Sequence, residues 1–155
     1  MTFVLAFLIG AFAGLRSMMA PAVVAWAIHL GQLKVDWPLA FLGHAVSVAI
    51  FSFAAIGELI ADKLPRTPAR TAAIGLSARI VTGGLTGACI AVAGGVQPVV
   101  GAILGAIGGV VGAFVGYQAR TRLAKIVGRD LIVAIAEDMI AIGGCVGVVT
   151  LIASV

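Results

Sequence analysis

Residues 101–116 decide the fold and read GAILGAIGGVVGAFVG, without a single charged side chain. The glycines of this stretch that recur at three- and four-residue spacing are Gly101, Gly105, Gly109, Gly112 and Gly116. That spacing places them along one side of an α-helix, where another helix backbone can approach closely. The stretch therefore predicts a membrane helix with a glycine stripe that packs against other helices.

The rest of the chain has a similar composition. Of its 155 residues, 62% are hydrophobic and 10% are charged, and the mean hydropathy is +1.21. A soluble domain is usually about 45–50% apolar and about 25% charged, so this chain lacks the polar surface of a water-soluble protein. Continuous apolar segments without alternation also argue against a β-barrel. We predict an all-α polytopic integral membrane protein, with one transmembrane helical domain over residues 1–155.

Five apolar segments are each long enough to cross a hydrocarbon core about 30 Å thick as a helix. They are residues 2–30, 37–64, 71–93, 98–118 and 131–155. The first is longer than one crossing needs and carries Arg16, Ser17 and Pro21 near its middle. Proline removes a backbone donor and clashes with the preceding turn. We expect about five spans, the first kinked or broken near Arg16 and Pro21; a re-entrant hairpin broken at Arg16 is the alternative.

Most of the basic residues gather in two expected loops. The loops 62–70 and 119–130 hold seven of the ten Lys and Arg residues. Because basic loops favour the cytoplasmic side, we expect both there, in a multi-pass protein of the cell inner (cytoplasmic) membrane. A spanning first segment would put the N-terminus inside, and a hairpin would put it outside. We attribute the net charge of +4 to basic residues that contact membrane lipids, and we expect no nucleic acid as a partner.

Ionisable residues within the spans are the candidates for chemistry, because they are costly in hydrocarbon and face a partner or a water-filled cavity. They are Arg16, Glu58, Arg79, Glu137 and Asp138, with Asp62 one helical turn beyond Glu58. At about 1.5 Å per residue, Glu58, Arg79 and Glu137 lie roughly 9–13 Å from the same boundary, and Arg16 lies deeper, near the midplane. We predict one buried cluster. It is either a site for an anion, a proton or a polar headgroup, or a salt-bridge network that fixes helix packing.

A series of motifs carries a resemblance to a known family. They are GLRS at 14–17, GELIADKLP at 57–65, Arg79 followed by glycines, QARTR at 118–122 and AEDMIAIGG at 136–144. Over nearly its whole length the chain resembles the family catalogued as domain of unknown function 4126. The resemblance implies a small bacterial-type membrane protein and brings no particular activity or substrate. Many members carry a longer polar stretch where this chain has the short 66–70.

Catalytic motifs do not stand out in the sequence. It has no P-loop, HExxH, GxSxG or Rossmann pattern in an appropriate context. Cys89 and Cys145 lie in apolar runs without a partner at metal-ligand spacing, so we interpret them as small packing residues. We expect no metal, no cofactor and no catalytic residue. Whether the protein is an enzyme stays open, and the absence of these motifs in the sequence argues against it.

Three functions fit these observations. We favour a small transporter or channel-like permease with a buried charged site in the cytoplasmic half of the membrane, acting on a small polar or anionic substrate. The alternative is a structural or accessory membrane subunit that packs through its glycine-rich helices. An enzyme acting on lipid headgroups is third. The glycine stripe serves packing within one chain, an interface or a pathway, and we expect a homo-oligomer because so small a chain has little interior.

Overall fold

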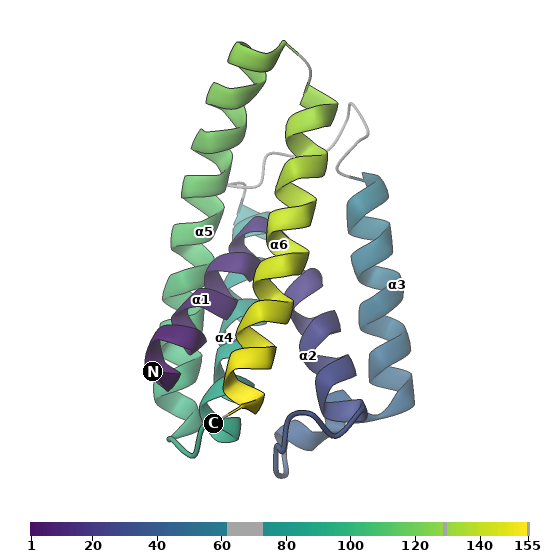
Figure 1. Cartoon of the computed structure of the whole chain (residues 1–155), viewed down its shortest axis with the longest axis vertical. Coiled ribbons are helices and arrows are strands. Elements are labelled where there is room, and N and C mark those ends of the chain that lie inside the picture. The colour runs from purple at the N-terminus through teal and green to yellow at the C-terminus, as the bar shows by residue number, and fades with distance from the viewer. Residues whose placement is uncertain (62–72, 129, 155) are drawn as a thin grey trace.

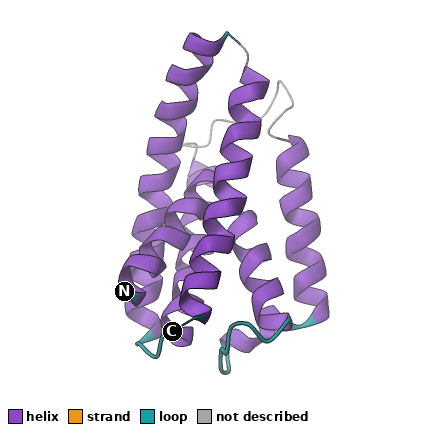
Figure 2. Ribbon diagram, in the orientation of Figure 1, coloured by secondary structure: helices purple, strands orange, loops and turns teal. Residues whose placement is uncertain are grey.

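The computed structural model describes residues 1–61, 73–128 and 130–154. The helices in chain order are α1 (Thr2–Leu15), α2 (Met19–His29), the short 3-10 helix η1 (Leu39–Gly43), α3 (Ala45–Ala61), α4 (Ala73–Ala93), α5 (Pro98–Val127) and α6 (Asp130–Ala153). Every regular element in these ranges is helical, as predicted, and the helices form an elongated bundle (Figures 1 and 2).

Three helices have the length and composition of membrane spans. They are α4, α5 and α6, which contain at least 21 residues each. The helices α1, α2 and α3 are apolar but shorter, with 14, 11 and 17 residues. The structure is therefore compatible with a membrane protein, and the expected number of about five spans stays a prediction.

The first apolar segment forms a hairpin of two helices. The start of α1 lies beside the end of α6, because a Cβ added to Gly94 would contact both Thr2 and Ile152. The end of α2 lies at the same end of the bundle, where Leu30 and Thr150 line one hollow. The segment thus enters the bundle and turns back (Figure 1). Our expectation of a path from one end to the other is wrong, and the hairpin alternative describes the observed path.

The hairpin turns at residues 16–18, which are not helical. Arg16 is extended, with φ −138° and ψ 108°, and ends α1. Pro21 lies in the first turn of α2. Proline is tolerated there because the first turn of a helix leaves its N–H groups without a partner in the helix. Pro21 therefore sits at the beginning of α2 and does not interrupt a longer helix.

The glycine stripe of α5 packs against other helices of the same chain. A Cβ on Gly109 would lie 2.5 Å from the backbone oxygen of Arg79 in α4, and Gly105 faces Gly83 in the same way. Gly101 also faces α4, Gly112 faces the backbone of Ala11 in α1, and Gly116 lines a hollow. The stripe is therefore used inside the chain and lends no support to an interface between copies. The homo-oligomer stays a prediction.

The helix α5 continues further than its apolar stretch. It extends to Val127, so that Arg120, Arg122 and Lys125 are helical. Our expectation of a loop from residue 119 is wrong, because residues 119–127 are mostly good helix formers without Gly or Pro. Gly128, with φ +69°, caps the helix in the left-handed conformation that glycine adopts at little cost. The other basic stretch, 62–70, lies outside the described residues.

Candidate functional site

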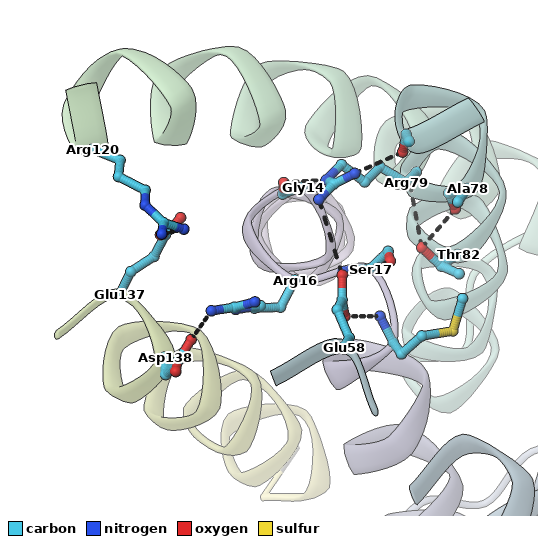
Figure 3. A network of polar contacts seen from close by, with 12 residues as sticks. Gly14, Arg16, Ser17, Glu58, Ala78, Arg79, Thr82, Arg120, Glu137 and Asp138 are labelled. Atoms are coloured by element: carbon cyan, nitrogen blue, oxygen red, sulfur yellow. Dashed lines mark hydrogen bonds and ion pairs between the residues drawn. The ribbon is translucent and has the colours of Figure 1, made fainter. Parts of the chain in front are cut away.

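The N-terminal end of α2 is bound by Glu58 of α3. Its carboxylate accepts hydrogen bonds from the backbone N–H of Ser17 at 2.9 Å, the Ser17 hydroxyl at 2.8 Å and the backbone N–H of Met18 at 2.8 Å (Figure 3). The N–H groups at the start of a helix have no carbonyl partner within it, and a negative charge there complements the helix dipole. Glu58 thus caps α2 in the middle of the bundle.

The C-terminal end of α1 is bound by Arg79 of α4. The Nε of Arg79 donates to the carbonyl oxygen of Gly14 at 2.9 Å, and Nη1 donates to Gly75 of its own helix at 2.8 Å. The last carbonyls of a helix lack partners within it, and a cation is favoured beside them. Arg79 is only 7% exposed. The two broken helix ends are therefore each held by a charge of the complementary sign.

Ion pairs connect these groups to one another and to α6. Arg79 Nη2 lies 3.9 Å from Glu58 Oε1, which joins the two capping side chains. Arg16, at the turn of the hairpin, forms an ion pair with Asp138 of α6 and is 1% exposed (Figure 3). Arg16 is adjacent to Ser17, which donates to Glu58. The Arg16–Asp138 and Arg79–Glu58 ion pairs therefore lie on either side of the hairpin turn. Charges from three other helices thus surround this turn.

A further ion pair joins α5 to α6. Arg120 Nη1 lies 3.9 Å from Glu137 Oε2, and the side chain of Arg120 is 17% exposed. Glu137 and Asp138 are neighbours on a helix and point about 100° apart, so that Glu137 can reach Arg120 while Asp138 reaches Arg16. We missed Arg120 in the sequence because we assigned this residue to a loop. The continuous run of helix formers up to Gly128 is the signal that would have found it.

The structure brings four of the six candidate residues, Arg16, Glu58, Arg79 and Asp138, together at the hairpin turn. The fifth, Glu137, precedes Asp138 by one position on α6 and pairs with Arg120. The sixth, Asp62, lies outside the described residues. Arg16 forms an ion pair with Asp138, and its deeper position in the membrane stays a prediction. A role of these residues in binding a substrate or ion stays a prediction.

Two hollows reach the hairpin turn from opposite halves of the bundle. One, of about 350 Å³, lies between α5 and α6 and is lined by Leu15, Arg120, Glu137 and aliphatic side chains. The other, of about 310 Å³, lies between α2, α3 and α6 and is lined in part by Met19 and Trp26. Along α6 the first covers residues 132–140 and the second residues 146–150. Leu15 and Met19 flank the turn, which therefore separates the two hollows.

A metal ion in a protein is usually held by several ligating side chains that lie close together. Within residues 1–61, 73–128 and 130–154, no three His, Cys, Asp or Glu side chains lie close enough together to hold a metal ion. Cys89 and Cys145 are buried, free thiols on α4 and α6. The chemistry available at the hairpin turn is therefore that of carboxylates, guanidinium groups, a hydroxyl and backbone amides.

Comparison with known proteins identifies the family. The family model described as Domain of unknown function (DUF4126) matches residues 3–152, which include the hairpin and all the charged residues around it. No curated protein and no solved structure matches the chain. The match extends over nearly the whole sequence, and it includes the motifs at 14–17, 57–65 and 136–144 that carried the resemblance. This chain belongs to the family described as domain of unknown function 4126.

Proposed function

We propose that the protein is a small membrane permease for a polar or anionic solute, with its site at the turn of the α1–α2 hairpin. The observation that carries this proposal is that two ionisable side chains, Glu58 and Arg79, bind the broken helix ends in the middle of the bundle. Helices that end inside the membrane, with their termini directed at a polar site, are typical of secondary transporters. Ionisable residues at such a depth usually serve a pathway.

In this proposal α3, α4, α5 and α6 cross the inner membrane, and the hairpin enters it from outside. The basic stretch 62–70 and the basic end of α5 then lie on the cytoplasmic side, as the excess of Lys and Arg favours. Both chain termini then lie on the non-cytoplasmic side of this membrane. This corresponds to the re-entrant alternative for the first segment, with the later loops unchanged.

The donors around Glu58 define what a solute would meet. The amides of Ser17 and Met18 and the guanidinium of Arg79 all present N–H groups toward the Glu58 carboxylate or toward Gly14. A carboxylate or phosphate of a solute would suit the same donors. Exchange of Glu58 for the solute's anionic group would therefore release the hairpin turn from α3.

A second function is favoured by the degree to which the charges already bind each other. Arg16 is 1% exposed and bound to Asp138, and both broken helix ends are capped. A network of this kind suits an accessory subunit, in which the charged residues stabilise the hairpin and no solute is transported. The two functions predict different results when the Glu58 charge is removed and one of its acceptor oxygens is kept.

The test compares Glu58→Gln with wild type in reconstituted vesicles. Glutamine has nearly the same shape and carries no charge, and it keeps one of the two acceptor oxygens, which can serve either Ser17 or the Met18 amide. Flux of acetate, glutamate, phosphate and chloride is measured for each protein. The control is Lys34→Gln, which removes a charge from an exposed position in the loop after α2. We expect wild type and Lys34→Gln to move at least one of these anions, and Glu58→Gln to move it about tenfold more slowly or worse while still folding. Folded wild-type protein that moves none of the four would overturn the permease in favour of the accessory function.

A further inference from the structure

The helix α3 lies at the edge of the bundle, beside α2 (Figure 1). Only Val48 and Ala55 of its 17 residues are buried, whereas seven of the 11 residues of α2 are buried. A Cβ added to Gly57 in α3 would contact nothing within 4 Å, but one on Gly83 in α4 would lie 2.5 Å from the backbone of α5. The helices α4 and α5 are therefore tightly packed, and α3 is loosely packed by comparison.

Polar contacts attach α3 to the rest of the bundle. Lipid tails are as apolar as the exposed side chains of α3, so that helix association in a membrane depends on close packing and hydrogen bonds. Near the end of α3, the carboxylate of Glu58 accepts three hydrogen bonds from Ser17 and Met18 at the hairpin turn. Halfway along α3, the Ser52 hydroxyl accepts one from Trp26 Nε1 at 3.0 Å. Glu58 is the stronger of these two attachments, because it is charged and accepts three bonds.

The beginning of α3 is fixed to α2 through η1. His44, in an extended conformation, joins η1 to α3. Nδ1 of His29 in α2 donates a hydrogen bond to the carbonyl oxygen of Gly43 at 2.8 Å, and Leu42 of η1 is fully buried. At about 1.5 Å per residue, this anchored end of α3 lies about 20 Å along the helix from Glu58.

We propose that α3 is a gate that pivots about its η1 end when Glu58 leaves the hairpin turn. Few buried contacts are typical of elements that move, and a hinge consists of a few residues at the end of an element, here residues 43–45. At about 20 Å from the hinge, a rotation of about 15° moves Glu58 by about 5 Å. This movement uncovers the N–H groups of Ser17 and Met18 toward the cytoplasmic side.

The inference deepens the proposed function and rests on the membrane placement given there. It assigns the opening of the site to one helix, α3, while α4 and α5 stay packed. The position of α3 and the flux of anions are separate measurements, so that either can fail while the other holds.

The experiment measures distances between pairs of spin labels by double electron–electron resonance in lipid nanodiscs. The full-length protein carries alanine in place of both native cysteines, so that the labels attach to added cysteines alone. The first pair, Ile60→Cys in α3 with Val115→Cys in α5, reports on the end of α3 near Glu58. The second pair, Val46→Cys in α3 with Val99→Cys in α5, reports on the hinge end. All four positions are exposed.

Three variants are compared with wild type for each pair. Glu58→Ala removes every contact of the carboxylate with the hairpin turn, and we expect it to lengthen the first distance by about 5 Å and leave the second unchanged. Glu58→Gln keeps one acceptor oxygen and should give a smaller change in the same direction. The matched control, Glu137→Gln, makes the same chemical change on α6, where the acid pairs with Arg120, and should change neither distance.

If Glu58→Ala fails to fold, Glu58→Gln decides the outcome. An unchanged first distance in the folded Glu58 variants, equal lengthening of both distances, or the same lengthening in Glu137→Gln would each overturn the gate. Lengthening in a protein that moves no anion would support the gate and overturn the permease. Anion flux through a protein whose Glu58 variants leave the first distance unchanged would do the reverse.

Discussion

Arg79 lies 3.9 Å from Glu58, and each of the two side chains binds one broken end of the α1–α2 hairpin. The pair therefore satisfies the backbone groups that the turn leaves without partners. A helix that ends inside an apolar bundle exposes backbone N–H and C=O groups that cost several kcal/mol each in hydrocarbon. A carboxylate at one end and a guanidinium at the other satisfy these groups, and each neutralises the charge of the other.

This relationship predicts strong coupling between the two residues. Arg79→Ala should lower the free energy of unfolding by about 3 kcal/mol, because it leaves the partly buried Glu58 without its cation and uncaps α1. The double variant Arg79→Ala, Glu58→Gln should be less damaging than the sum of the single changes. Denaturant unfolding in detergent measures all four proteins of the cycle. Strict additivity would show that the two side chains do not interact.

The neighbouring acids on α6 should be coupled to different cations. Arg16 binds Asp138, whereas Arg120 lies by Glu137. The double-mutant cycles replace Arg and Glu by Gln and Asp by Asn. Arg16 should couple to Asp138 by about 0.5–3 kcal/mol and more weakly to Glu137. Arg120 should couple more strongly to Glu137 than to Asp138. Thermal unfolding of the single and double variants gives the coupling energies. Equal coupling of Arg16 to both acids would contradict the observed pairing.

The same substitution should have opposite effects at two glycines. A Cβ on Gly83 would lie 2.5 Å from the backbone oxygen of Gly105, so that Gly83→Ala should push α4 and α5 apart at a cost of about 1–3 kcal/mol or more. A Cβ on Gly143 in α6 would contact nothing within 4 Å. Gly143→Ala should therefore stabilise the protein by up to about 1 kcal/mol through helix propensity. Unfolding temperatures compare the two, and similar changes at both sites would be inconsistent with this packing.

The hairpin predicts where the N-terminus lies in the cell. An epitope tag placed before Met1 should be accessible only from outside, as should a cysteine at position 34, because the end of α2 and the start of α1 share one end of the bundle. A cysteine at position 122 should react only from the cytoplasm. Labelling uses a chain in which Cys89 and Cys145 are replaced by alanine. A tag accessible from the cytoplasm, with residue 34 outside, would mean that the first segment crosses the membrane.

Properties that depend on composition and local spacing could be predicted from the sequence alone. The all-helical fold, the family and the positions of the apolar segments were predicted, because hydropathy and the absence of alternation act residue by residue. The identity of the buried charged residues was also predicted, since an ionisable side chain in an apolar run is costly wherever its partner lies. The interruption of the first segment near Arg16 and Pro21 could be anticipated for the same local reason.

The path of the chain beyond that interruption was decided by the tertiary structure. Pro21 indicates a place where a helix can begin but does not say whether the chain continues or turns back. The turn depends on Glu58, which is 41 residues from Ser17, and on Arg79, which is 65 residues from Gly14. The partners of the glycine stripe were decided in the same way, by the contacts of α5 with α1 and α4. Both outcomes rest on backbone groups that only distant parts of the chain can satisfy or approach, and local sequence does not specify which parts those are.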